Sequence, residues 1–341
     1  MSSKERVEAA LRLEEPDRVP VMSPFQGFWA LGAGNLPVEE SFRDPVKAAN
    51  AQLNILDACK FDGIEILWDW LAPVDALGCK VKIPEKGNPV TVERVVKASE
   101  DIDRLKVPDL RGHKRTISDF EAARILKEKI GGSHFTYITL ALPFTLAGEL
   151  RGVQNFMVDL MKRPSDAHKL IKFSTEVLLA YLEFSADMGF EAIFWCDPTA
   201  SADLISPKQF REFSLPYIEQ VVKKTKERGL FAFLHICGDT TPELKMIYEA
   251  MPHLMSVDMK VDLKVAKEII GDKITILGNV DTTTLFQKSI DETSKAAVEC
   301  VRSAGKRGFI LGAGCDIPVG APLENIKAMI EAPSKGGIFY G

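Results

Sequence analysis

Hydrophobic positions along the chain fall into two alternating patterns. Short runs rich in β-branched and other apolar residues predict strands, and longer stretches with apolar residues on one helical face separate most of them. Eight strands are predicted, over residues 19–23, 63–68, 135–141, 192–196, 231–236, 255–257, 274–278 and 309–312. Strands that alternate with helical stretches in this way form parallel sheets.

Amphipathic helices are predicted between most of these strands, over residues 44–58, 166–188, 207–228, 241–250, 263–270 and 289–304. A last helix is predicted to start at Pro322, because proline suits the first helical turn. Eight strand–helix units predict an α/β fold of the closed (β/α)₈ type, a TIM barrel, with residues 1–341 as a single domain. A doubly wound open sheet is the alternative, but no G-x-G-x-x-G motif follows the first strand.

One segment departs from this alternation of strands and helices. Residues 71–132 are too many for a single crossover between two strands. Its sequence KVKIPEKGNPVTVERVV predicts a small hairpin whose turn lies around Lys86, Gly87, Asn88 and Pro89. A charged stretch, SEDIDRLKVPD, follows the hairpin. We therefore predict an insertion within the barrel, between its second and third strands, rather than a separate domain.

Composition narrows the class of protein without identifying it. The 341 residues are 46% apolar and 27% charged, which is ordinary for a globular protein. The net charge of −5 gives no electrostatic reason to expect a nucleic-acid or membrane partner, and no apolar run has membrane-spanning length. The charged N-terminus lacks a signal-peptide core, and six scattered cysteines are typical of reduced thiols, so we expect a cytoplasmic protein.

Polar residues follow the predicted strands, at the end of a barrel where catalytic groups lie. They are Asp69, Asp197, Asp239, Asp258, Asn279, Asp281 and Asp316. Aspartate and asparagine also favour turns and helix caps, so a capping role remains open for each of them.

A histidine and two cysteines give the sharper signal. His235 and Cys237 are two residues apart in FAFLHICGD, so on an extended strand end their side chains point the same way. Cys315 follows the last predicted strand in FILGAGCDIP, where glycines allow close backbone approach. Imidazole and thiolate ligands favour zinc, and three protein ligands leave a fourth position open for chemistry.

The other cysteines carry weaker signals. Cys59, Cys79 and Cys300 lie in helical or inserted segments and are predicted to pack as small apolar residues, as is Cys196 at the end of its strand. A lone cysteine or histidine is itself usually a packing residue, so the metal prediction rests on the three residues acting together.

The segments HICGD, GNVD and GAGCDIP…PLENIKAMI resemble the cobalamin-dependent methyltransferases of the uroporphyrinogen decarboxylase superfamily. The resemblance is to methylcobalamin:coenzyme M methyltransferases and spans nearly the whole chain, from RVEAALRLEEPDRVPV to the last helix. It implies a (β/α)₈ barrel with His235, Cys237 and Cys315 as zinc ligands. Uroporphyrinogen decarboxylases themselves match less well, because they carry an arginine-rich motif where this chain has SPFQGFWALG, and they lack the H-x-C pair.

This resemblance implies a zinc-dependent enzyme that moves a methyl group between a corrinoid, free methylcobalamin or a corrinoid protein, and a small thiol. In this hypothesis Asp197 and Asp258 are candidate catalytic residues, with Asp258 a possible resting zinc ligand. Asn279, Asp281 and Trp68 are candidates for corrinoid binding. Lys260 and Arg151 are candidate cations for a sulfonate acceptor, with a solvated surface role as the alternative.

Two further hypotheses stay open. A donor-side methyltransferase would take methyl from a methyl ether or a methylamine-type compound and pass it to a Co(I) corrinoid protein. The aromatic residues Phe25, Phe28 and Trp29, with Trp68 and Trp70, suit an aromatic ether or a flat corrin ring, or else core packing. A non-catalytic barrel stabilised by zinc would need a fourth protein ligand.

Overall fold

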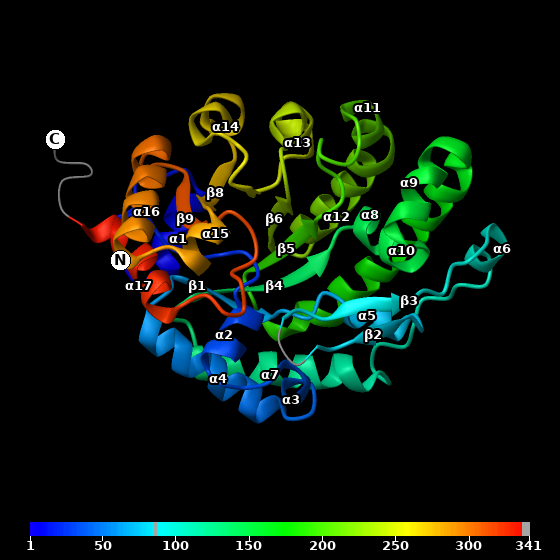
Figure 1. The fold of residues 1–341 in the computed structure, drawn as a ribbon, viewed down its shortest axis with the longest axis horizontal. Coiled ribbons are helices and arrows are strands. Elements are labelled where there is room, and N and C mark those ends of the chain that lie inside the picture. The colour runs from blue at the N-terminus through cyan, green and yellow to red at the C-terminus, as the bar shows by residue number, and fades with distance from the viewer. Residues whose placement is uncertain (85–86, 336–341) are drawn as a thin grey trace.

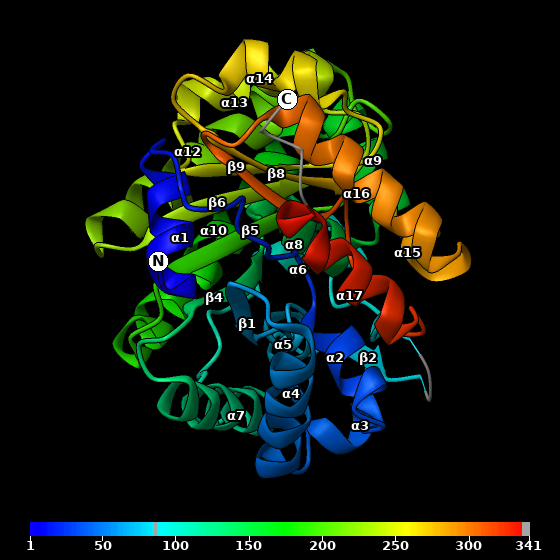
Figure 2. The same cartoon turned by 90° about the vertical axis from the view of Figure 1, so that its left-hand side faces the viewer.

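A computed structural model describes residues 1–84 and 87–335. Seven parallel strands form one curled sheet in the order β1-β4-β5-β6-β7-β8-β9. The strands are β1 (Gly63–Leu67), β4 (Phe135–Ala141), β5 (Ala192–Asp197), β6 (Phe231–Ile236), β7 (Leu254–Val257), β8 (Thr275–Val280) and β9 (Phe309–Ala313). Figures 1 and 2 show this sheet curving around a common centre, with helices outside it. The predicted α/β barrel class is confirmed.

The first predicted strand, at residues 19–23, is reduced to a single bridge. Val21 pairs in parallel with Leu311 of β9, and the Met22 N–H donates to the Leu311 carbonyl at 3.1 Å. On the other side, the Asp62 N–H donates to the Val21 carbonyl at 2.8 Å. The segment therefore joins β9 to the start of β1. It forms no longer strand because Pro20 and Pro24 have no N–H to give to a ladder.

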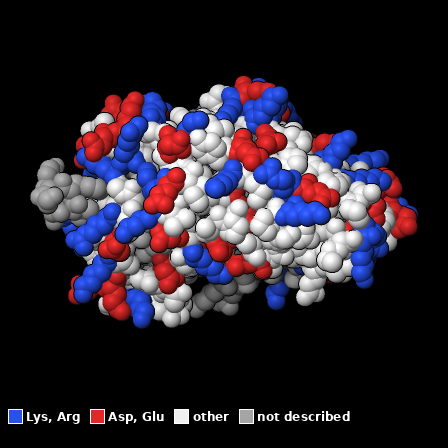
Figure 3. Space-filling view, turned by 90° about the horizontal axis from the view of Figure 1, so that it is seen from above, with Lys and Arg blue, Asp and Glu red and all other residues white. Residues whose placement is uncertain are grey.

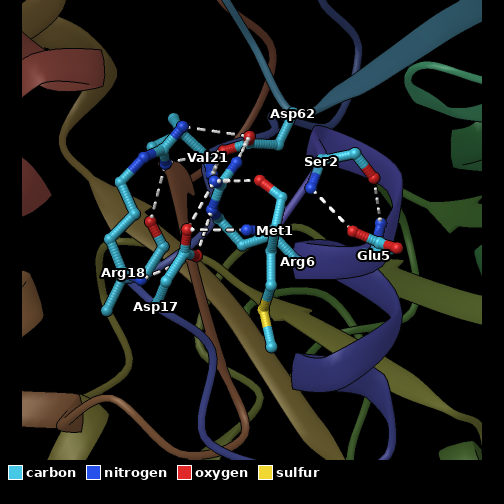
Figure 4. Close-up of polar contacts among 9 residues, drawn as sticks. Met1, Ser2, Glu5, Arg6, Asp17, Arg18, Val21 and Asp62 are labelled. Atoms are coloured by element: carbon cyan, nitrogen blue, oxygen red, sulfur yellow. Dashed lines mark hydrogen bonds and ion pairs between the residues drawn. The ribbon is translucent and has the colours of Figure 1, made fainter.

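Buried ion pairs fix this closing segment to the bottom of the barrel. Arg6, on helix α1 (Ser3–Leu11), donates to Asp62 at 2.7 Å and to Asp17 at 2.6 Å. Arg18 also donates to Asp62, at 2.8 Å, and the Val21 N–H donates to the same carboxylate (Figure 4). Asp62 directly precedes β1, so the network joins both edges of the sheet at the end opposite the strand mouths.

The crossover helices pack around the sheet (Figure 1). They are α2 (Gly27–Ala33), α3 (Val38–Ser41), α4 (Pro45–Cys59), α7 (Lys114–Ile130), α8 (Pro143–Arg151), α9 (Val153–Lys162), α10 (Pro164–Ser185), α11 (Pro207–Gln209), α12 (Leu215–Glu227), α13 (Leu244–Ala250), α14 (Leu263–Ile270), α15 (Thr282–Gln287), α16 (Ile290–Ala304) and α17 (Leu323–Glu331). Among the described residues, none of these helices is long and apolar enough to cross a bilayer.

Three of the helix predictions need correction. The predicted helix 207–228 is divided by a π-helical turn, Phe210–Ser214, between α11 and α12. The predicted helix 241–250 begins as a 3₁₀ turn, Thr241–Glu243, before α13. Pro322 caps α17 instead of occupying its first turn, since its ψ of 133° is extended.

The interrupting segment contains the predicted hairpin. It consists of α5 (Ala72–Ala76), the antiparallel strands β2 (Lys80–Lys82) and β3 (Val90–Glu93), α6 (Ser99–Ile102), and then the crossover helix α7. Lys86, in the predicted turn, lies outside the described residues. Asn88 lies in the same connection, and its side-chain amide donates to Asp316 beyond β9. The hairpin therefore reaches the mouth of the barrel.

Large apolar side chains fill the lower barrel interior. Phe135 and Tyr137 of β4 pack with Phe194 of β5, Phe233 of β6 and Leu277 of β8 in one buried cluster. Because successive strand residues point to opposite faces, the next inward positions along β4 and β6 are Thr139 and His235. Polar side chains therefore begin where the apolar filling ends, at the mouth.

Candidate metal centre

Three predicted ligands converge at the mouth of the barrel. Nε2 of His235 lies 3.2 Å from Sγ of Cys237, and that sulfur lies 3.2 Å from Sγ of Cys315. All three ligand atoms lie within 4.8 Å of one another. His235 is buried, whereas the cysteines are partly exposed. The structure thus brings together residues that are far apart in the chain and leaves access from the sulfur side.

The strand ends explain this convergence. His235 is an inward residue of β6, and Cys237 follows one residue after the strand ends. Gly238 then turns the chain with a φ of +88°, a conformation that glycine adopts easily. A Cβ at this position would lie 2.3 Å from an Oδ2 of Asp203. Glycine is therefore required beside Cys237 for both its conformation and the close packing.

A serine orients the imidazole. Oγ of Ser256, on β7, lies 3.0 Å from Nδ1 of His235, and both residues are buried. With Nδ1 held by the hydroxyl, Nε2 is the nitrogen that faces the two sulfur atoms. The ring of Phe25 meets the imidazole edge-on at 5.2 Å between centroids, which adds an apolar wall.

These three residues fit a zinc ion. Zinc binds histidine nitrogen and cysteine sulfur at about 2.0–2.3 Å, so tetrahedral geometry separates ligand atoms by roughly 3.5–3.8 Å. The observed spacings of 3.2 Å are slightly shorter, and small side-chain rotations would admit the ion. One nitrogen and two sulfur donors match the borderline-soft character of zinc. The group could hold zinc with a fourth position free.

The ionisation of Cys237 and the ionisation of Cys315 depend on each other. A hydrogen bond between them, together with the nearby imidazole, lowers the pKa of Cys315. The same hydrogen bond, burial and the neighbouring negative charge raise the pKa of Cys237. Without a cation, the pair therefore favours a single negative charge. A divalent ion would stabilise the doubly ionised form that metal binding needs.

The structure places Asp258 and Asp197 on opposite sides of the His235 strand, at the ends of β7 and β5. Asp258 accepts from the Gly238 N–H at 2.9 Å and from the Lys260 N–H at 3.0 Å. It thus braces the turn that carries Cys237. One oxygen of Asp197 accepts from Thr145 at 2.5 Å, and its other oxygen has no hydrogen-bond partner among the residues that the structure describes. Burial raises the pKa of Asp197 to about 6.

The predicted corrinoid-binding residues have separate positions. Trp68 is buried after β1 against Gly27, and its indole N–H has no hydrogen-bond partner in the described part of the chain. The Asn279 amide donates to the carbonyls of Asp258 and Val261, at 3.0 and 2.8 Å. Asp281 caps α15 by accepting from the Thr283 N–H at 2.8 Å. Asn279 and Asp281 also line a groove of about 350 Å³ that extends to α16.

The remaining cysteines stay outside the ligand group. Cys59 and Cys79 are buried, Cys300 is partly buried, and Sγ of Cys196 donates to the Leu140 carbonyl at 3.2 Å. Their burial agrees with the packing role predicted for them.

Sequence reasoning missed three residues of the site. Ser256 lies in an apolar strand with no pattern to distinguish it. Asn88 is far in sequence from the three predicted ligands. Glu65 stands in the middle of β1, where it accepts from the Gly27 N–H at 2.7 Å and from the Thr139 hydroxyl. Burial raises the pKa of Glu65 to about 7. A charged residue inside the apolar run GIEIL was the one available signal for it.

The structure is a parallel barrel with a histidine–cysteine–cysteine group at its mouth that could hold a metal ion at the strand ends. A family model described as Uroporphyrinogen decarboxylase (URO-D) matches residues 2–335. The chain therefore belongs to the uroporphyrinogen decarboxylase family.

Several of the known proteins that this chain resembles are methyltransferases. Methylcobamide:CoM methyltransferase MtbA of Methanosarcina mazei is 30% identical over 335 residues, which cover 96% of each chain. Methylcobamide:CoM methyltransferase MtaA of Methanosarcina barkeri is 29% identical over 338 residues, again 96% of each chain. A solved methyltransferase structure from Methanosarcina mazei superposes with a TM-score of 0.89, at 27% identity, over 98% of this chain and 99% of that one. The chain is an enzyme that resembles these methyltransferases.

Proposed function

We propose that this enzyme transfers a methyl group between a corrinoid and a small thiol, with zinc held by His235, Cys237 and Cys315. The convergence of these three ligand atoms within 4.8 Å carries the proposal. It is supported by the likeness to methyltransferases whose names specify a methylcobamide and the thiol CoM.

The transfer balances as a displacement at carbon. The thiol loses its proton to water, and its sulfur forms a bond to the methyl carbon of methyl-Co(III). The carbon–cobalt bond breaks and leaves both electrons on cobalt, which becomes Co(I). When bound at the three ligands, zinc supplies an open position at which a thiol ionises near neutral pH.

The chain's own side chains have distinct roles in this proposal. Two anionic sulfurs and a neutral imidazole offset the charge of the ion, which favours a nucleophilic sulfur over strong Lewis acidity. Ser256 holds the imidazole, and Asp258 holds the Gly238 turn. Asp258 already accepts two backbone hydrogen bonds, so we assign it to positioning the Cys237 loop. Asp197 forms a polar wall of the mouth.

A second candidate uses the same residues in the donor direction, to demethylate a methyl ether or a methylamine-type compound onto Co(I). The apolar wall that Phe25 forms beside His235 favours it. In that case the substrate would present oxygen or nitrogen, and no acceptor thiol would be needed.

Absorption spectroscopy of the cobalamin tests the proposed function. Zinc-loaded enzyme is mixed with methylcobalamin and a panel of small thiols, and the cobalamin spectrum is followed. We expect demethylation that requires a thiol and is lost in Cys237→Ala, while Cys59→Ala, which removes a buried thiol outside the ligand group, retains it. Demethylation without any thiol, or equal rates with Cys237→Ala, would refute the proposal. Consumption of aryl methyl ethers with Co(I) corrinoid would establish the second candidate.

A further inference from the structure

The mouth of the barrel is rich in carboxylates that lack a cationic partner. Glu65, Asp197, Asp258 and Asp316 are drawn from β1 and from the ends of β5, β7 and β9. Within residues 1–84 and 87–335, none of the four forms an ion pair with lysine or arginine, whereas Asp69 nearby is paired with Arg115. A ligand entering the mouth therefore meets carboxyl groups that have no lysine or arginine partner within the described part of the chain.

Both cations predicted for a sulfonate are already occupied. Nζ of Lys260 lies 2.7 Å from Asp203, and both side chains are solvent-exposed. Nε of Arg151 lies 2.7 Å from Asp159, and this arginine also donates to the Lys97 carbonyl at 2.8 Å. Binding a sulfonate at either residue would mean displacing a carboxylate.

Two acceptor atoms beside the metal centre lack a donor. Asp316 follows the ligand Cys315, and one of its oxygens accepts from the side-chain amide of Asn88. The other oxygen of Asp316 and the amide oxygen of Asn88 are shielded from solvent and have no hydrogen-bond partner within residues 1–84 and 87–335. A shielded acceptor without a donor is costly, so this pair is suited to a ligand that brings N–H groups.

We propose that the thiol substrate carries an ammonium group, held by Asp316 and Asn88, instead of the sulfonate of coenzyme M. This inference rests on the proposed function and identifies the substrate class of the same site. Sulfur would face the open metal position while the ammonium donates to the free oxygens of Asp316 and Asn88. An anionic tail in this place would meet the carboxyl groups of Asp316 and Glu65, with no cation from the described residues paired with either of them. Asp316 is thus a specificity-determining residue.

Binding of methylated thiols tests this inference independently of turnover. Zinc-loaded enzyme is titrated calorimetrically with 2-(methylthio)ethylamine, 2-(methylthio)ethanol and 2-(methylthio)ethanesulfonate, which differ only in the tail. We expect the amine to bind at least about tenfold more tightly than the sulfonate, with the alcohol between them. The corresponding free thiols should rank in the same order in methylcobalamin demethylation.

Matched variants test whether Asp316 causes this order of affinities. Asp316→Asn preserves size and should lower the preference for the amine over the alcohol about tenfold. Asp187→Asn removes an exposed carboxylate far from the mouth and should leave the ranking unchanged. Lys86→Met removes a lysine close in sequence to Asn88, and the sulfonate should remain the weakest ligand.

Two results would overturn the inference: the sulfonate binding as tightly as the amine, or Asp316→Asn leaving the ranking unchanged. A preference for sulfonate that disappears in Lys86→Met would also overturn it and assign the anion site to that lysine. Failure of the proposed function is distinguishable, because it would abolish methyl transfer for every thiol while the binding ranking persisted.

Discussion

The two ends of this barrel treat buried carboxylates in opposite ways. At the bottom, Asp62 precedes β1 and is held by Arg6 and Arg18, at 2.7 and 2.8 Å (Figure 4). Glu191 precedes β5 and is held in the same manner by Lys4 and Lys127, at 2.8 and 2.9 Å. At the mouth, the described part of the chain provides no such partner for Asp197, Asp258 or Asp316.

The paired carboxylates at the bottom serve stability, whereas the unpaired carboxylates at the mouth are suited to function. A carboxylate with two cations keeps its charge at little electrostatic cost and ties distant segments together. A buried carboxylate without one carries an unfavourable desolvation energy, which is tolerated at sites where a ligand supplies the missing charge. Active sites of (β/α)₈ barrels lie at the mouth, in agreement with this division.

The largest change in the free energy of unfolding is expected for a substitution at the bottom of the barrel. Asp62→Ala would remove the buried carboxylate that Arg6 and Arg18 share. Among the described residues, Arg6 would keep only Asp17 as an acidic partner and Arg18 would keep none, so the free energy of unfolding should fall by about 3 kcal/mol. Urea denaturation measures this loss. Asp17→Asn serves as the matched control, since Asp17 is 44% exposed and its loss should cost less. Equal losses of unfolding free energy in the two variants would contradict the larger role assigned to Asp62.

Ser256→Ala should have the next largest effect, on zinc affinity. Loss of the hydroxyl frees Nδ1 of His235, and loss of such a partner typically costs 10–100-fold in metal affinity, or about 1.4–2.7 kcal/mol. Competition with a chromophoric chelator measures the affinity. Ser174→Ala, which alters a buried hydroxyl away from the site, should leave zinc affinity unchanged. A role for Ser256 in packing alone would lower stability and spare the affinity.

Asp197→Asn should stabilise the protein. The pKa of Asp197 is raised to about 6 by burial, so the folded state binds more protons than the unfolded state between pH 4 and 6. Stability contributed by this group is therefore lost as pH rises through that window. The variant should gain about 1–2 kcal/mol at pH 8 and show little of this pH dependence. Destabilisation at pH 8 would mean that the charge of Asp197 is compensated after all.

Surface pairs should give the smallest effect. Lys80 and Glu93 form an ion pair across the hairpin, and each side chain is 68% exposed. Lysine and arginine alternate with acidic residues over the face in Figure 3, so single pairs change the local potential little. Lys80→Ala should change the free energy of unfolding by less than about 0.5 kcal/mol in thermal melts. A larger loss would show that the hairpin depends on this pair.

Sequence patterns predicted the parts of this molecule that depend on local physics. Apolar runs located β1 and β4–β9. His235 and Cys237 were found because they stand two residues apart at the end of β6, and Cys315 because it follows β9. The bridge at Val21 was overpredicted as a strand, since apolar character there reflects burial while the flanking prolines prevent a ladder. Ser256 and Asn88 could not be found, because their partners are set by tertiary packing.

The proposed function requires that the open metal position take a sulfur atom from the substrate. X-ray absorption at the zinc edge tests it directly, on zinc-loaded enzyme before and after addition of 2-aminoethanethiol. We expect two sulfur ligands at about 2.3 Å without the thiol and three with it. A zinc shell that keeps two sulfurs after the thiol is added would contradict it.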